Sequence, residues 1–347
     1  MSNKNLLKNN ILNPFRFDGR GVSKNKTPNE SGLGRFFITF KDSFNKIFLV
    51  NIIMVLGNLP AIFLIAVLSG YTRETAFLPS SDLFQNLSGI YLIEGASPSQ
   101  MALYAMECLP SAILVNTTLT YVFLGIGALV LFTFGIVSAG STYVLRNIAM
   151  GEAVFVWSDF WYAVKRNWKI ALPFGIVDIL INLLLAFNLY TTISNGSFAT
   201  SLMFWSNLII AILYFFMRSY IYIQIVSFDM PIMKMIKNSL IMSLVGFKRN
   251  ILALLGCLIF VILELFFIFG AGGILISLGV AMPLAIMFSA TEYMRVYAAF
   301  FKIKELIIDP YLKEHPEEAE DYYEDAIMRD DVTESERLAQ IKDKMNI

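Results

Sequence analysis

Long apolar stretches are the dominant pattern along this chain. A helix rises ~1.5 Å per residue, so crossing ~30 Å of hydrocarbon takes about 20 mostly apolar residues. Six stretches approach or exceed this length, at 47–68, 121–145, 170–190, 203–228, 251–269 and 274–289. They are continuously apolar and lack the period-2 alternation of barrel strands. The pattern therefore predicts an all-α, polytopic membrane helix bundle with six transmembrane helices.

A weak internal repeat groups these helices in pairs. An amphipathic lead-in with aromatic or basic residues precedes each odd-numbered stretch, at 40–48, 164–172 and 247–255. Each even-numbered stretch ends in a segment where a hydroxyl residue lies close before a tyrosine, at 141–146, 218–224 and 290–296. The Gly-rich turn at 270–273 is tight enough only for a helical hairpin. We expect three pseudo-repeated hairpins, related by an axis along the membrane normal, with lead-in helices lying in the interface.

The charge pattern assigns sides to the membrane. Hydrophobic residues make up 56% of the chain and the net charge is zero, but of the 27 lysines and arginines only Arg73 falls between the first two spans. The positive-inside rule then predicts a cytoplasmic membrane protein with both termini inside. Its expected parts are a cytoplasmic segment at 1–46, a membrane domain at 47–308 with an external insertion at 71–120, and an acidic cytoplasmic tail at 309–347.

The regions outside the spans contain few chemical signals. We expect the external insertion to form a small amphipathic cap with a helix at 99–108, because its carboxylates are too dispersed for a metal site. The acidic tail lacks the apolar content for a core of its own. Its His315 is the single histidine of the chain and is expected to be solvated. Cys108 and Cys257 lie at different depths and are not expected to form a disulfide.

Two carboxyl groups lie inside predicted spans. Asp178 is followed one helical turn later by Asn182, and Glu264 lies midway along the fifth span. Ionisable groups at this depth cost roughly 2.5 to 3.5 kcal/mol on insertion scales and usually face a bundle interior or a wet cavity. Two interpretations stay open: Asp178, Asn182 and Glu264 line a solute or proton path, or they are neutral groups that hydrogen-bond between helices.

A second polar group is predicted at the cytoplasmic ends of the even-numbered spans, formed by Arg146, Arg218, Glu292 and Arg295. Such residues either bind a phosphate or lipid head group or extend their charges to the interface. Both interpretations are compatible with the sequence.

Several segments resemble the YesL-type family of bacterial integral membrane proteins. They are FDG at 17–19, Pro60, TFGIVSAGSTYVLRNIAMGE at 133–152 and SDFWYAVKRNWKIAL at 158–172. The resemblance covers the first two hairpins best, and the insertion at 71–120 departs from the family pattern. It implies a cytoplasmic membrane protein associated with carbohydrate uptake, for which membrane transporter subunits are candidate partners.

Enzyme signatures are absent from the sequence: it has no Walker A, H-E-x-x-H or G-x-S-x-G motif and no paired cysteine cluster. We therefore expect no catalytic residue, cofactor, metal or nucleic-acid partner. Asp178 and Glu264 inside the spans, together with the family resemblance, favour a non-enzymatic protein that is accessory to or part of solute uptake. The alternative is a structural or regulatory membrane protein that docks a partner through its basic loops and acidic tail. An intramembrane enzyme is a third hypothesis.

Overall fold

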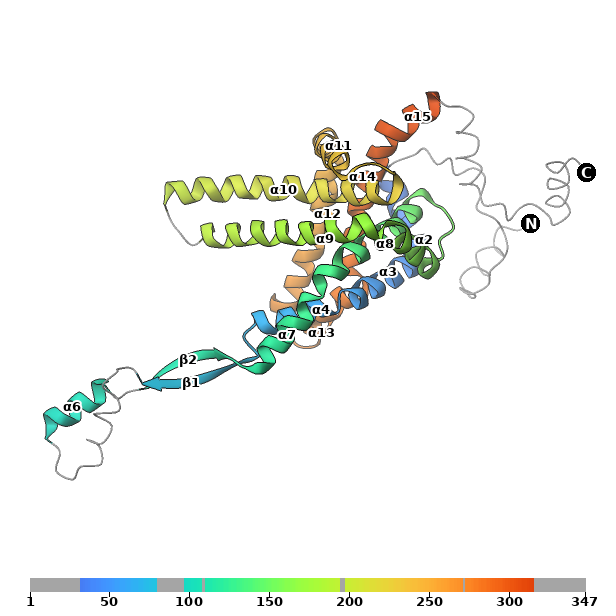
Figure 1. Cartoon of the computed structure of the whole chain (residues 1–347). Helices are drawn as coiled ribbons and strands as arrows, with labels where there is room; N and C mark the ends of the chain where they lie inside the picture. Colours follow the sequence, from blue (N-terminus) through green and yellow to red (C-terminus); the bar gives the residue numbers. More distant parts are fainter. Residues whose placement is uncertain (1–31, 80–96, 108–109, 194–196, 271, 315–347) are drawn as a thin grey trace, which may run out of the picture. The chain divides into compact units, whose positions relative to one another are not determined.

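The computed structural model describes residues 32–79, 97–107, 110–193, 197–270 and 272–314 (Figure 1). The predictions about FDG at 17–19, Cys108, His315 and most of the acidic tail lie outside these residues. The described chain is mostly helical. Among the described residues, five helical segments are long and apolar enough to cross a membrane, or six if the bent pair of α3 and α4 counts as one span.

The bent pair corresponds to the first predicted span. The first lead-in, predicted at 40–48, spans the end of α2 (Leu33–Asp42) and the first turns of α3 (Phe44–Gly57), and α4 (Pro60–Leu68) follows. The axes of α3 and α4 differ by 62°. Pro60 explains the break, because proline has no N–H for the helical ladder and is accepted at the first position of a new helix.

The other spans begin earlier or end later than the hydropathy pattern predicts. The segments are α7 (Thr118–Ala128) with α8 (Val130–Met150), α9 (Val156–Ile193), α10 (Phe198–Ser227), α12 (Phe247–Leu265) with η2 (Phe266–Gly270), and α13 (Ile274–Met282), η3 (Pro283–Met287), α14 (Phe288–Ile303), η4 (Lys304–Ile308) and α15 (Asp309–Glu314). The second and third lead-ins are not separate elements, because they form the first turns of α9 and α12. At 1.5 Å per residue the 38 residues of α9 extend about 57 Å, well beyond the hydrocarbon thickness.

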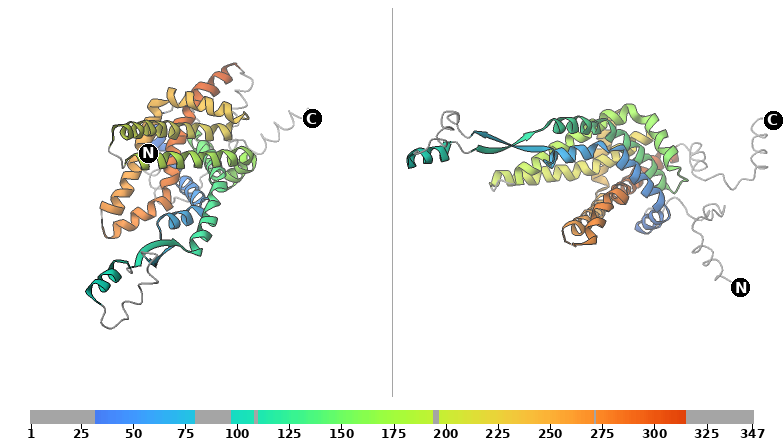
Figure 2. Two further views of the ribbon diagram at one scale, coloured as in Figure 1. Left: turned by 60° about the vertical axis from the view of Figure 1, so that its left-hand side comes forward. Right: turned by 90° about the horizontal axis from the view of Figure 1, so that it is seen from below.

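The insertion contains strands that an all-α prediction missed. Strand β1 (Arg73–Pro79) pairs antiparallel with β2 (Pro110–Asn116), from Arg73 opposite Asn116 to Pro79 opposite Pro110. Figure 2 shows them as a ribbon. Helix α6 (Pro98–Glu107) agrees with the helix expected at 99–108. The strands were missed because each is short and finds its partner more than 30 residues away.

The chain divides into two compact units, each described by itself. Unit 1 comprises Met1–Ile52, Ala139–Arg166 and Trp205–Ile347, and unit 2 comprises Ile53–Ser138 and Asn167–Phe204. Unit 1 contains the α12–α13 hairpin, orange in both views of Figure 2. Its turn has positive φ at Gly272 and Gly273, a conformation that glycine adopts without strain.

Unit 2 is held by close backbone contact between α8 and α9. A Cβ atom on Gly135 or on Gly175 would overlap the backbone of the other helix. Small residues at such crossings let membrane helices approach through van der Waals contact. At the base of the β1–β2 ribbon, the Thr120 hydroxyl of α7 donates to the carbonyl of Thr72 at 2.7 Å. This hydrogen bond joins the ribbon to α7.

Candidate functional site

The repeated tyrosines of unit 1 each contact a lead-in segment. The Tyr143 ring lies 5.8 Å from the ring of Tyr162, at the start of α9. The Tyr220 hydroxyl donates to Asn250 Oδ1 at 3.1 Å, at the start of α12. The Tyr293 ring stacks on Phe36 of α2 at 5.3 Å. The first hairpin thus contacts the second lead-in, the second hairpin contacts the third, and the third contacts the first.

The residue before each of these tyrosines is buried. These residues are Thr142, Ser219 and Glu292, with exposed fractions of 0%, 4% and 4%. The Thr142 hydroxyl donates to Glu292 Oε1 at 3.4 Å. Ser219 lies beside Arg295, which itself pairs with Glu292. Equivalent positions of the three repeats therefore meet in one place beside Arg295. We call Thr142, Ser219, Glu292 and Arg295 the central cluster.

The centre of this cluster is a buried ion pair. Arg295 pairs with Glu292 one turn earlier on α14, and their side chains are only 11% and 6% exposed. The guanidinium also lies over the Phe215 ring, 5.1 Å from its centroid. Desolvated charges are tolerated when both are paired and hydrogen-bonded. Thr142 and Phe215 supply those additional contacts from α8 and α10.

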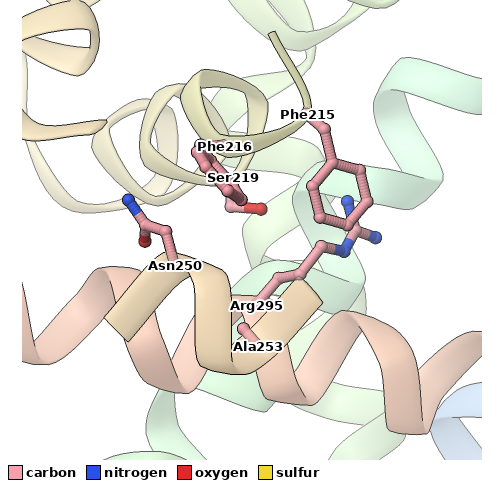
Figure 3. A pocket seen from close by; sticks show the side chains of 6 residues that line it. All are labelled: Phe215, Phe216, Ser219, Asn250, Ala253 and Arg295. Atoms are coloured by element: carbon pink, nitrogen blue, oxygen red, sulfur yellow. The ribbon is translucent and has the colours of Figure 1, made fainter. Parts of the chain in front are cut away.

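A small cavity lies beside the pair (Figure 3). It is lined by Phe215, Phe216, Ser219, Asn250, Ala253 and Arg295. Its volume of about 10 Å³ suits about one water molecule. Figure 3 shows the Ser219 hydroxyl directed from α10 toward Phe215 and Arg295, and this oxygen has no hydrogen-bond partner among the described residues. Because buried hydroxyls are usually paired, a single water in this cavity would satisfy Ser219.

The other two predicted arginines belong to the same unit but not to the ion pair. Arg146 donates to Ser227 Oγ at 2.8 Å and to Asn147 Oδ1, and its guanidinium covers the Tyr143 ring. Arg218 lies over the Tyr222 ring at 5.5 Å. The structure therefore joins Glu292 and Arg295 directly, while Arg146 and Arg218 anchor α8 and α10 separately.

The carboxyl of Glu152 lies just beyond the end of α8. Burial raises its pKa above the ordinary glutamate range, and Asp159 adds to this effect, while the charge of Arg146 opposes it. Glu152 is thus the one carboxyl outside the spans for which the structure indicates a raised pKa, among the residues described here. The sequence did not single it out, because the effect depends on folding.

The two predicted carboxyls of the spans have different surroundings. Asp178 in unit 2 is 0% exposed, and Asn182 Nδ2 donates to its Oδ1 at 2.8 Å and to its backbone carbonyl at 2.7 Å. Glu264 lies in unit 1, near the end of α12, and is half-buried. The hydrogen bond between Asn182 and Asp178 matches the expected spacing of one helical turn.

The central cluster can stabilise charge, but its chemistry is not that of a metal site. Among the residues that the structure describes, no group of three His, Cys, Asp or Glu side chains comes together. Sequence reasoning identified Glu292 and Arg295 and missed Thr142 and Ser219. The sequence signal that could have identified Thr142 and Ser219 is the position they share, directly before the repeated tyrosine.

The long apolar helices have the length and composition of membrane-spanning helices. Residues 114–189, which include α7, α8 and most of α9, match the model of a family described as "Protein of unknown function, DUF624". This region contains Thr142, Arg146 and Asp178, so part of the central cluster lies in the matched segment. No curated protein and no solved structure matches the chain.

Proposed function

We propose that this chain is a multi-pass protein of the YesL type in the cytoplasmic membrane, and that it is an accessory to or a component of solute uptake without being an enzyme. Carbohydrate is the solute class that the family resemblance implies. The observation that carries the proposal is the desolvated Glu292–Arg295 pair, held where α8, α10 and α14 of the three repeats meet.

A buried ion pair contributes little to stability compared with apolar packing of the same volume. Within membrane helices such charges are rare and mark solute or ion pathways, because apolar residues would serve the packing role at lower cost. The pair also contacts more than one repeat, through Thr142 and Phe215. A change in its charge state or hydration would therefore alter contacts between repeats, which is the coupling that an uptake component requires.

The test compares uptake of a panel of labelled mono- and oligosaccharides by cells with and without the chain. The double variant E292Q/R295Q removes both charges and leaves neither one unpaired, so it is expected to fold. We expect its uptake to fall to the level of cells without the chain. The matched control is E305Q, which removes a carboxylate whose side chain is 52% exposed and should leave uptake unchanged.

Folding of each variant is checked by membrane insertion and by size-exclusion profile in detergent. A correctly inserted E292Q/R295Q protein with normal uptake would remove the central cluster from the function. Uptake that is the same with and without the whole chain would overturn the uptake proposal itself.

A further inference from the structure

Helix α11 (Ile232–Val245) lies between the fourth and fifth predicted spans and was not among the predicted elements. Its 14 residues extend about 21 Å, too short to cross ~30 Å of hydrocarbon. It begins after Pro231 and ends at Gly246. In Figure 1 it is seen nearly end-on beside α10, so it runs crosswise to that helix.

One face of α11 is fixed to unit 1. Met235, Ser239 and Met242 are buried, and Gln224 Nε2 of α10 donates to Ser239 Oγ at 2.7 Å. A Cβ at Gly246 would overlap the hydroxyl of Tyr220, so the turn into α12 is also closely packed. These contacts determine which side chains of α11 point outward.

The outward face combines large apolar side chains with lysines. Its exposed apolar residues are Met233, Leu240, Ile241, Leu244 and Val245. Lys234 and Lys237 are exposed among them, and Lys248 follows at the start of α12. At 100° per residue the α11 positions among these share one side of that helix, with Lys248 just beyond its end. Within the described part of the chain none of the three lysines has an ion-pair partner, and α11 itself contains no acidic residue.

We propose that the outward face of α11 binds anionic phospholipids, with the helix lying in the plane of the membrane interface. The apolar side chains enter the acyl region, and the lysines extend to the phosphate groups. Packing this lysine-bearing face against a second apolar protein surface would be unfavourable, because the lysines would be desolvated there. The charge therefore selects an acidic lipid surface as the occupant.

The experiment measures binding of phosphatidylglycerol and phosphatidylcholine with matched acyl chains to the full-length protein in detergent, by native mass spectrometry. We expect the wild-type protein to prefer phosphatidylglycerol. The variant K234Q/K237Q/K248Q should weaken that binding at least about tenfold, since each lysine near an anionic surface contributes on the order of a fivefold change in affinity. Added glycerol phosphate should not compete, because it lacks the acyl chains.

The matched control removes three exposed charges from α9 in K165Q/R166Q/K169Q. This variant should keep the preference for phosphatidylglycerol. An equal loss in both triple variants would mean that net charge alone attracts the lipid and would overturn the assignment to α11. Unchanged binding in K234Q/K237Q/K248Q, or displacement by glycerol phosphate alone, would overturn it as well.

Discussion

Glu292, which pairs with Arg295, carries a charge at the position where the other two repeats carry hydroxyl groups. Thr142 donates to Glu292, whereas Ser219 faces the small cavity on the side of Arg295. The three copies of one sequence position therefore have different roles at a shared place.

Individual site residues could be predicted from the sequence only where they carry a charge. Glu292 and Arg295 stood out because ionisable groups near a span are costly. Ser219 and Asn250 are common helix residues, and their roles arise only when α10 packs against α12. Asn51 is a similar case: its amide donates to the carbonyls of Pro283 and Leu284 and accepts from the amide of Ser289, across more than 230 residues of sequence.

Glu152 supplies a prediction about pH. Its pKa is raised in the folded protein, so the unfolded chain loses this proton first as the pH rises. Folded-state stability should therefore fall as the pH rises through the ordinary glutamate pKa toward the raised one. E152Q cannot titrate at this position, so it should not lose this stability as the pH rises. At neutral pH it should be more stable than the wild type by on the order of 1 kcal/mol at most, because partial exposure screens the effect.

Thermal unfolding in detergent, on both sides of the ordinary glutamate pKa, measures this difference. The two proteins should unfold at similar temperatures at the acidic end and diverge toward neutral pH. The exposed carboxylate of Glu74 provides the control E74Q, which should keep the wild-type pH dependence. Parallel curves for E152Q and the wild type would contradict the assignment.

Helix elements were predictable where hydropathy alone determines them. Each predicted span overlaps a described helical segment, because hydrocarbon requires long continuous apolar runs, but α9 begins at Val156 and the last segment extends to Tyr311, well outside the predicted 170–190 and 274–289. Hydropathy does not distinguish a lead-in that lies in the interface from one that continues into a span, so the continuity of α9 was missed. Helix α11 was not predicted for a related reason: its 14 residues are too few for a span, and its lysines interrupt the apolar pattern.

The crossing of α8 and α9 gives a prediction at the scale of elements. Gly175→Ala adds a methyl group where the backbone of Gly135 already fills the space. Overpacking of this kind costs about 1–3 kcal/mol, and more if the helices cannot separate. Gly125→Ala is the matched control, because nothing lies within 4 Å of the added Cβ and alanine favours a helix by up to about 1 kcal/mol.

Reversible unfolding of the two variants in detergent tests this contact. Gly175→Ala should lower the unfolding free energy, and Gly125→Ala should leave it unchanged or raise it slightly. If Gly175→Ala were as stable as Gly125→Ala, the close approach of the two helices would be wrong.

At the scale of the whole molecule, the contacts of Tyr143, Tyr220 and Tyr293 close a ring of three repeats within unit 1. Such closure needs every lead-in on the same side of the membrane as the ends of the even-numbered spans. It therefore depends on the bent pair α3–α4 acting as one crossing, which would make six in total. The proposed arrangement has both termini in the cytoplasm and the β1–β2 ribbon outside.

The direct test of this arrangement is the labelling of single cysteines in intact and permeabilised cells, after replacement of Cys108 and Cys257 by alanine. Thr75→Cys on β1 and Glu305→Cys on η4 are exposed positions with clear expectations. A membrane-impermeant maleimide should label Thr75→Cys in intact cells and Glu305→Cys only after permeabilisation. Labelling of both positions from outside, or of Glu305→Cys alone, would contradict the six-span topology and the ring that depends on it.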